Sequence, residues 1–363
     1  MSCPQIRIGI IGAGQLGQML GHAARDLDVE CRFVDPSDSP PAAECGEVVQ
    51  RPFDDAEALA DLAATCDVIT YEFENVPVEA LQEIGNDTPV FPPAKALRQA
   101  QDRLDEKRLF DQLGIPLPGY RTIESRADLE AAADELGLPV VIKTRRLGYD
   151  GKGQFVIRER SDIDEAWKML GANALIAEQW VAFDYEVSCI GVRNIDGDIA
   201  IYPLSHNVHE DGILRTSRSP VDNPVLAERA EVYMRHMLSH LDYVGVLALE
   251  LFVCGDELLA NEFAPRVHNS GHWTIEGSET SQFENHLRAI LNKPLGSTTS
   301  IGHAGMVNLI GELPEAARSL DAGVLHDYGK SARPGRKLGH ITVTADTGAK
   351  RDELIDTISR SVT

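Results

Sequence analysis

The chain has 363 residues, which is long for one domain, so we expect two or three domains. Its hydrophobic fraction of 43% and charged fraction of 25% are ordinary for a globular protein. The net charge of −23 argues against nucleic acid as a partner, because an acidic surface repels phosphate backbones.

The cysteines and the apolar runs limit the class of protein further. The 6 cysteines lie far apart and form no CxxC pair, which argues against a zinc site or a disulfide framework and favours a cytoplasmic protein with reduced thiols. The first residues, MSCPQIRIG, lack the pattern of a secretory signal. No apolar run approaches the roughly 18 residues of a membrane span, so we expect no membrane partner.

Residues 1–98 are expected to form a parallel α/β domain, because short apolar runs alternate with helical patterns. The predicted strands are IRIGII, ECRFVD, DVITYEF and PVFPP, and the predicted helices are QLGQMLGHAARDL and DAEALADLAATC. The two prolines of FPPAKAL mark the end of this domain.

The first predicted strand leads into Gly12-x-Gly14-x-x-Gly17. Asp35 ends the next apolar run, near the place of the acidic residue in the dinucleotide-binding fingerprint. Taken alone, this pattern predicts an NAD-dependent oxidoreductase. However, a glycine turn at a helix N-terminus attracts any phosphate or polar group, so the fingerprint indicates a geometry and not a particular cofactor.

Residues 99–294 read as a second domain, with a smaller lid subdomain at about 118–182. A charged helix should stop at Gly114, strand-rich stretches follow, and a long helix should run from about Asn223 to Leu241. A hairpin with Gly255 and Asp256 at its turn should cover 245–264. Residues 295–363 form a third, small unit of short strands with the basic turn GKSARPGRKLGH.

Lys143 ends the buried run PVVIK and is soon followed by the glycine-rich turn GYDGKG. Such a turn lets backbone N–H groups approach an anion closely, and a neighbouring lysine supplies a positive charge for phosphate. The alternative is an ordinary glycine hairpin beside a surface lysine.

Glu250 lies inside the apolar run VLALELFV, where a carboxylate is costly unless it is paired or binds a metal. A two-residue turn would place it opposite Asn261, whereas a three-residue loop from Gly255 to Glu257 would place it opposite Glu262. Two opposed carboxylates suit Mg²⁺ with phosphates as further ligands. The alternative is a pair of solvated glutamates on an edge strand.

The segment APRVHNSGHWT follows directly and places Arg266, His268, Asn269, Ser270 and His272 close together. It has no HExxH glutamate and no clear helix, so we favour an anion-binding loop over a zinc site. The segment SHNVHEDGILRTSRSP reads, by itself, as a solvated loop.

Together these motifs resemble the ATP-grasp superfamily and, within it, the 5-(carboxyamino)imidazole ribonucleotide synthetases of purine biosynthesis. The resemblance is carried in family order from residue 9 to 340 by GAGQLGQML, TYEFENV, RRLGYDGKGQ, EQWVAFDYEVS, YPLSHNVHEDGILRTS, NEFAPRVHNSGHWT and ARPGRKLGH. It implies an α/β and α+β chain: an ATP-grasp fold with a Rossmann-like pre-ATP-grasp domain before it and a small β-rich domain after it.

The resemblance also implies an activity and its ligands. The enzyme is a carbon–nitrogen ligase that uses ATP, Mg²⁺ and bicarbonate to carboxylate 5-aminoimidazole ribonucleotide through carboxyphosphate, giving ADP and phosphate. The partners are small molecules, and the family implies a homodimer. In this family the first domain helps to hold the ribonucleotide and does not bind NAD.

The family pattern assigns roles to residues of this chain. For ATP it implies Arg103, Lys143, Gly148, Tyr149, Asp150, Gly151, Lys152, Gly153, Gln154, Glu178, Gln179, Trp180, Val181, Glu186 and His209. It makes Glu250 and Glu262 the magnesium ligands with Asn261 beside them, and it places Arg266 and Asn269 at bicarbonate, so that Lys143, Arg266 and Asn269 act in catalysis. Our candidates for the ribonucleotide are Gln15, Glu72, Tyr149, Asp150, Arg215, Lys330 and Arg336.

Three alternatives remain at this point. The nearest is a formate-dependent glycinamide ribonucleotide transformylase, another ATP-grasp ligase. The second is an NAD-dependent oxidoreductase, which rests on the glycine turn alone. The third is a nucleotide sensor without catalysis, which the retained Lys143, Glu250 and Glu262 disfavour.

Overall fold

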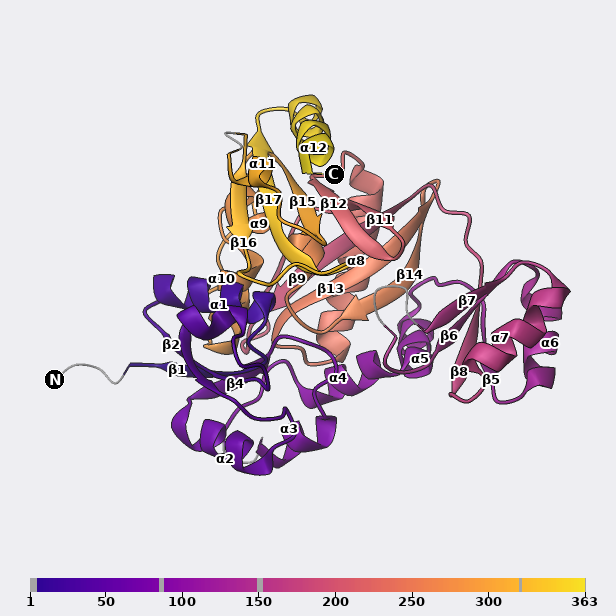
Figure 1. The fold of residues 1–363 in the computed structure, drawn as a ribbon, viewed down its shortest axis with the longest axis horizontal. Helices are drawn as coiled ribbons and strands as arrows, with labels where there is room; N and C mark the ends of the chain where they lie inside the picture. Colours follow the sequence, from indigo (N-terminus) through magenta and orange to yellow (C-terminus); the bar gives the residue numbers. More distant parts are fainter. Residues whose placement is uncertain (1–4, 85–87, 149–152, 320–321, 363) are drawn as a thin grey trace.

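The computed structural model describes residues 5–84, 88–148, 153–319 and 322–362. Figure 1 shows a first unit with α1 to α3, a central sheet, and a smaller sheet with β5 to β8 that stands to one side of the centre.

The first unit is built on a four-stranded parallel sheet with the order β3-β2-β1-β4, which confirms the predicted parallel arrangement. Ile8, Ile10 and Ile11 of β1 have no exposed surface, since helices cover both faces of a parallel sheet. The elements of this unit are β1 (Arg7–Ile11), α1 (Gln15–Asp26), β2 (Glu30–Val34), η1 (Pro41–Glu44), β3 (Gly46–Val49), α2 (Ala56–Thr65), β4 (Val68–Tyr71) and α3 (Val78–Ile84).

The first unit differs from the sequence prediction at its end. PVFPP forms no strand, and Val90 makes only an isolated parallel bridge with Ile69. The prediction was wrong because Pro92 and Pro93 have no N–H group with which to extend the pairing. β3 and α3 were not predicted.

Two helices that follow one another connect the first unit to the rest of the chain: α4 (Ala94–Gln101) and α5 (Arg103–Leu113). Asp102 caps α5 by accepting a hydrogen bond from the Leu104 N–H at 3.0 Å. Gly114 ends the helix with φ of 66°, a left-handed conformation that favours glycine, so the predicted stop is confirmed.

The small sheet is antiparallel with the order β5-β8-β6-β7. Leu129 and Ile163 belong to the core that two helices form with it. Its elements are β5 (Tyr120–Ile123), α6 (Arg126–Leu136), β6 (Val140–Thr144), β7 (Gln154–Ile157), η2 (Arg160–Asp162), α7 (Ile163–Leu170) and β8 (Leu175–Gln179). We call this part the lid.

The central sheet is antiparallel and has the order β14-β13-β9-β11-β12-β15-β17-β16, with β10 paired to β9. Its strands are β9 (Tyr185–Arg193), β10 (Ile199–Ile201), β11 (Ser205–Glu210), β12 (Ile213–Ser219), β13 (Gly245–Cys254), β14 (Glu257–Ala264), β15 (His303–Ile310), β16 (Val324–Asp327) and β17 (Lys337–Ala345). Its helices are α8 (Pro224–His240), η3 (Asn269–Gly271), α9 (Thr274–Gly277), α10 (Gln282–Ile290), α11 (Glu315–Arg318) and α12 (Gly348–Val362). The strands after residue 295 therefore continue the sheet that begins with β9.

The first unit packs against the central sheet. One apolar cluster runs from Leu20 of α1 to Phe283 of α10. The Thr70 hydroxyl of β4 and His286 Nε2 of α10 lie 2.9 Å apart in the buried contact. On the other side of the sheet, α8 approaches β9 so closely that a Cβ on Gly191 would lie 2.5 Å from Met234. The first unit and the central sheet therefore share one apolar core.

Candidate active site

A cleft of about 460 Å³ opens where the lid, the central sheet and the first unit meet. Lys143 comes from the lid, Glu250 from β13 and Gln15 from the start of α1. The predicted site residues that line it are Gln15, Arg103, Lys143, Gly148, Gln154, Glu178, Gln179, Trp180, Val181, Glu186, His209, Glu250, Asn261, Glu262, Arg266 and Asn269.

The remaining predicted residues fall into two groups. Gly153, Glu72, Arg215, Lys330 and Arg336 are described but are not among the residues that line this cleft. Tyr149, Asp150, Gly151 and Lys152 lie outside the described residues.

The carboxylate pair sits on the hairpin of β13 and β14. Cys254 pairs with Glu257, so the turn has two residues, yet Glu250 pairs with Glu262. A β-bulge reconciles the two: Leu251 pairs with Ala260, and Asn261 is the extra residue. Directly paired residues point to the same face, so the two carboxylates face the cleft together.

Each carboxylate of this pair has a basic partner. Arg103 Nη1 donates to Glu262 Oε2 at 2.9 Å, and His268 Nε2 lies 3.1 Å from Glu250 Oε1. Burial alone would raise the pKa of Glu262, but the charge and hydrogen bond of Arg103 outweigh it and lower this pKa to about 2. Glu262 is therefore ionised at neutral pH.

Lys143 and Glu178 line the part of the cleft that the lid forms. Lys143 Nζ donates to Glu178 Oε2 at 2.7 Å, and Lys107 Nζ lies 3.6 Å from Glu178 Oε1. Burial would raise the pKa of Glu178, but the two lysines lower it to about 2. Burial lowers the pKa of Lys143, and the Glu178 charge opposes that shift. The cleft thus holds a lysine whose present partner is a carboxylate, a position that suits a phosphate oxygen.

The outer part of the cleft has an apolar wall and a polar pair. Phe183 and Phe252 stack with ring centroids 4.7 Å apart and both line the cleft, next to Trp180. His209 Nδ1 lies 2.7 Å from a Glu186 oxygen. Burial lowers the pKa of His209, but the hydrogen bond to Glu186 together with the charges of Glu250, Glu186 and Glu262 outweighs it and raises this pKa. Flat apolar side chains beside a carboxylate suit a nucleoside base and its ribose.

The segment after β14 presents Arg266 and Asn269 to the cleft. Arg266 Nη2 lies 2.6 Å from Glu74, which comes from the first unit. Both side-chain amide atoms of Asn269 are buried and have no hydrogen-bond partner in the described part of the chain. A buried amide without partners costs stability, so the Asn269 amide is available to hydrogen-bond a ligand in the cleft.

Two carboxylates of the protein accept hydrogen bonds from backbone N–H groups of the glycine turn. Glu72 accepts hydrogen bonds from the N–H groups of Gly14 and Gly17, and Asp35 accepts one from Ala13 at 2.9 Å. Burial raises the pKa of Glu72 despite these bonds. The place where a pyrophosphate would meet the helix N-terminus is therefore filled by Glu72, which disfavours a dinucleotide there.

The basic candidates for the ribonucleotide have local partners. Lys330 Nζ contacts Gln15 Oε1 beside the cleft, and burial lowers the pKa of this lysine to about 8. Arg215 Nε lies 3.1 Å from a Glu210 oxygen. Arg336 Nη1 donates to the Ser331 hydroxyl at 2.9 Å. Of these three, Lys330 is the one that touches a residue of the cleft wall.

Three family models match the chain in sequence order: a ribonucleotide synthetase pre-ATP-grasp domain over 5–101, an ATP-grasp domain over 108–283, and a phosphoribosylaminoimidazole carboxylase C-terminal domain over 304–354. The N5-carboxyaminoimidazole ribonucleotide synthase of Pseudomonas aeruginosa is 48% identical over 340 residues, which cover 93% of this chain and 94% of the relative. The chain belongs to the N5-carboxyaminoimidazole ribonucleotide synthase family. This is the family expected from the sequence motifs.

Solved structures of the N5-carboxyaminoimidazole ribonucleotide synthase family have the same fold. The enzyme of Thermus thermophilus matches with a TM-score of 0.94 and 50% identity, covering 98% of both chains. The Aspergillus clavatus enzyme, solved with ADP and 5-aminoimidazole ribonucleotide, matches with a TM-score of 0.92 and 33% identity over 99% of this chain and 98% of that one. The predicted ATP-grasp fold, with a unit before and after it, is thereby confirmed. No helix in the described ranges is long and apolar enough to cross a membrane.

Sequence reasoning missed several residues of this family site. Lys107 and Glu106 are almost fully buried near the carboxylate pair, and Glu74 contacts the predicted Arg266. His268, which the sequence placed in the candidate anion-binding loop, contacts Glu250. Lys107 had a signal: it lies three residues after Leu104 and three before Phe110, on the apolar face of a helix. Glu74 lies in the quoted motif TYEFENV, but no local pattern identifies its partner, because Arg266 is far away in the sequence.

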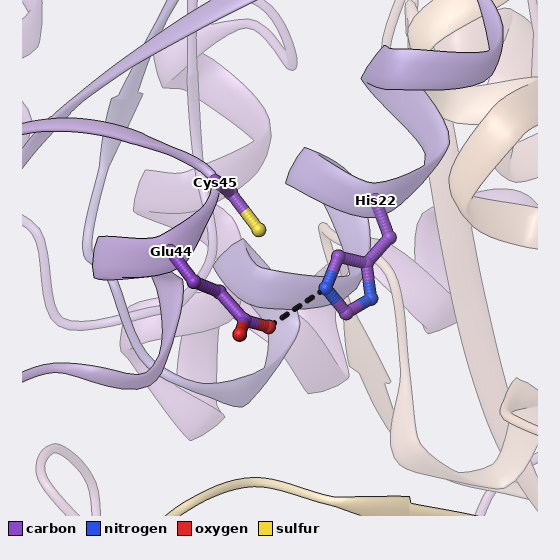
Figure 2. Close-up of side chains that lie close together, drawn as sticks. All are labelled: His22, Glu44 and Cys45. Carbon is purple, nitrogen blue, oxygen red and sulfur yellow. Dashed lines mark hydrogen bonds and ion pairs between the residues drawn. The ribbon is translucent and has the colours of Figure 1, made fainter.

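A separate group of polar side chains lies between α1 and η1. Figure 2 shows His22, Glu44 and Cys45 converging, with possible ligand atoms within 4.8 Å of one another. Glu44 is already bound by Gln18 and His22 at 2.9 Å each, and the Arg25 guanidinium donates to the Glu44 carbonyl. A guanidinium there opposes a cation, so we interpret the group as surface polar contacts outside the cleft.

Proposed function

We propose that the protein catalyses the ATP-dependent carboxylation of 5-aminoimidazole ribonucleotide in purine biosynthesis. ATP, bicarbonate and the ribonucleotide give ADP, phosphate and N5-carboxyaminoimidazole ribonucleotide. The observation that carries the proposal is one cleft that holds Lys143, the opposed Glu250 and Glu262, and the unpartnered amide of Asn269.

The donor set at the hairpin fits Mg²⁺. Glu250 and Glu262 offer opposed hard carboxylate oxygens, and Asn261 lies beside them at the bulge. When bound with ATP, Mg²⁺ neutralises charge on the phosphates. Arg103, which now contacts Glu262, is placed to contact a phosphate as well.

The first half of the reaction activates bicarbonate, which is a poor electrophile. A bicarbonate oxygen attacks the γ-phosphorus of ATP, the bond to the β-phosphate oxygen breaks, and ADP leaves, giving carboxyphosphate. Lys143 stabilises the negative charge of the transferring group. We place bicarbonate at Arg266 and Asn269, where the amide of Asn269 orients it.

The second half transfers the carboxyl group. The exocyclic amine of the ribonucleotide attacks the carboxyl carbon, the nitrogen–carbon bond forms, the bond from that carbon to the phosphate oxygen breaks, and the departing phosphate takes up the amine proton. The substrate supplies the nucleophile, so no protein nucleophile is needed. We place the ribonucleotide between Gln15 and Lys330, whose ammonium suits its phosphate, with Arg215 and Arg336 as further candidates. Glu72 then supports the turn that positions Gln15.

One assay tests the proposal against its alternatives. ADP release is measured with the aminoimidazole ribonucleotide or with glycinamide ribonucleotide plus formate, each with and without bicarbonate, and labelled bicarbonate is followed into product. We expect ADP release that needs the aminoimidazole ribonucleotide and bicarbonate together, and labelled product. Formate-dependent ADP release would instead support the transformylase. No ADP release with any substrate would support the sensor.

We also propose a homodimer that acts in the cytoplasm. The homodimer follows from the family resemblance, and the cytoplasmic location follows from the scattered thiols. Light scattering on the purified full chain tests the assembly, and a mass of one chain at micromolar concentration would contradict it.

A further inference from the structure

The bulge that sets the carboxylate pair lies on an edge strand. β14 ends the central sheet, so within the described ranges one side of its backbone pairs with no strand. Asn261, the extra residue, breaks the regular pairing just before Glu262. Contacts that β14 makes on this edge therefore bear directly on where the Glu262 side chain lies.

Two buried side chains of α5 complete the hydrogen bonds of this edge. Lys107 Nζ donates to the Asn261 carbonyl, and Glu106 Oε1 accepts from the Phe263 N–H at 2.7 Å. Lys107 is 1% exposed and Glu106 is 2% exposed. Charged side chains are rarely buried to this extent without a specific partner, and here the partners are the backbone groups on either side of Glu262.

We propose that Glu106 and Lys107 are positioning residues that hold Glu262 opposite Glu250 and so determine how tightly the pair binds a divalent cation. Arg103, from the same helix, contacts the Glu262 carboxylate itself. Three side chains of α5 therefore contact three consecutive residues of β14. The Pro116 carbonyl adds a fourth contact by accepting from the Ala260 N–H at 2.7 Å.

Lys107 also links these contacts between α5 and β14 to the lid. Its Nζ lies 3.6 Å from Glu178 Oε1, and the other oxygen of Glu178 accepts from Lys143. Loss of Lys107 would therefore change both the strand and the lid lysine. Loss of Glu106 removes the hydrogen bond to Phe263 and a charge near Glu262, and Glu106→Gln separates these two effects. Glu106 is thus the cleaner position for a test.

The inference rests on the proposed function, because it takes Glu250 and Glu262 as cation ligands. Glu106→Leu removes the acceptor for the Phe263 N–H, while Glu106→Gln keeps an oxygen there. The matched control is Asp105→Leu, which removes the neighbouring carboxylate of α5, one that pairs with Arg108 near the surface at 3.6 Å. Binding of Mn²⁺ to the full chain with ADP is measured through the spin-resonance signal of the free ion, beside melting temperature.

We expect Glu106→Leu to raise the Mn²⁺ dissociation constant about tenfold, since a buried N–H without a partner shifts the strand. Glu106→Gln and Asp105→Leu should stay within about twofold of the native protein. Native-like Mn²⁺ binding by Glu106→Leu, even with a lower melting temperature, would show a merely structural role and overturn the inference. If Glu106→Leu does not fold, Lys107→Met takes its place with the same readouts. Absence of Mn²⁺ binding by the native chain would instead refute the proposed cation site itself.

Discussion

Glu178 is a buried carboxylate and Glu262 is a partly exposed one, and basic neighbours lower the pKa of both to about 2. Their partners differ in kind, however. Glu178 contacts Lys107 and Lys143, whereas Glu262 lies opposite Glu250 and contacts Arg103. The first carboxylate holds lysines in place, and the second is available to a ligand.

Glu262→Gln is expected to leave the chain folded and to lower ADP release by at least about 100-fold, because a neutral amide is a poor ligand for Mg²⁺ and leaves phosphoryl charge uncompensated. Initial rates at saturating ATP measure the effect. Glu257→Gln on the same strand is the control, since its exposed side chain faces Arg229. Near-native turnover of Glu262→Gln would refute the metal assignment.

Lys330 predicts a pH dependence of substrate binding. Burial lowers its pKa to about 8, so the ammonium is present below that pH and is lost above it. We expect the KM for the ribonucleotide to rise about tenfold from pH 7 to 9 while the KM for ATP changes little. Lys330→Arg keeps its charge and should give a flat profile. A rising profile in Lys330→Arg would show that another group is responsible.

At the scale of elements, the sequence predicted the hairpin and named both possible partners of Glu250. It could not choose correctly between them, because the answer combines the two-residue turn with a bulge. That bulge is contacted by side chains of α5, far upstream in the sequence, and a local pattern does not contain such information. The same limit applies to Glu72, whose place against Gly14 and Gly17 depends on tertiary packing.

The glycine turn makes its own prediction. NAD should not raise the melting temperature, because Glu72 fills the helix N-terminus, whereas the aminoimidazole ribonucleotide should raise it by binding only the folded state. In Gly14→Ala the new Cβ would lie 2.7 Å from Glu72 Oε1, so the KM for the ribonucleotide should rise more than that for ATP.

Gly114→Ala is the control for Gly14→Ala. Its φ of 66° strains a side chain, but nothing lies within 4 Å, so it should lower the melting temperature without a selective change in KM. An equal rise of both KM values in Gly14→Ala would point to a general loss of structure. Stabilisation of the native chain by NAD would restore the dinucleotide interpretation.

At the scale of the whole molecule, the net charge of −23 repels itself in the folded state. At 0.1 M salt, the repulsion between charges more than about 10 Å apart is largely screened. We therefore expect the melting temperature to rise between low salt and about 0.5 M salt, similarly with sodium and potassium chloride. A melting temperature that falls with salt would show that attractive ion pairs outweigh the repulsion.

The order of strands in the central sheet limits how this chain can be dissected. Residue 295 looks like a boundary in the sequence, yet β15 pairs with β12 from Thr216 to Ser219. A fragment ending at 294 would keep β12 but expose its outer backbone groups, and such an edge recruits other chains. We expect that fragment to aggregate where the full chain does not, as size-exclusion chromatography would show. Residues 295–363 thus cover the edge of β12, and the C-terminal strands have to pair before that edge is protected from other chains.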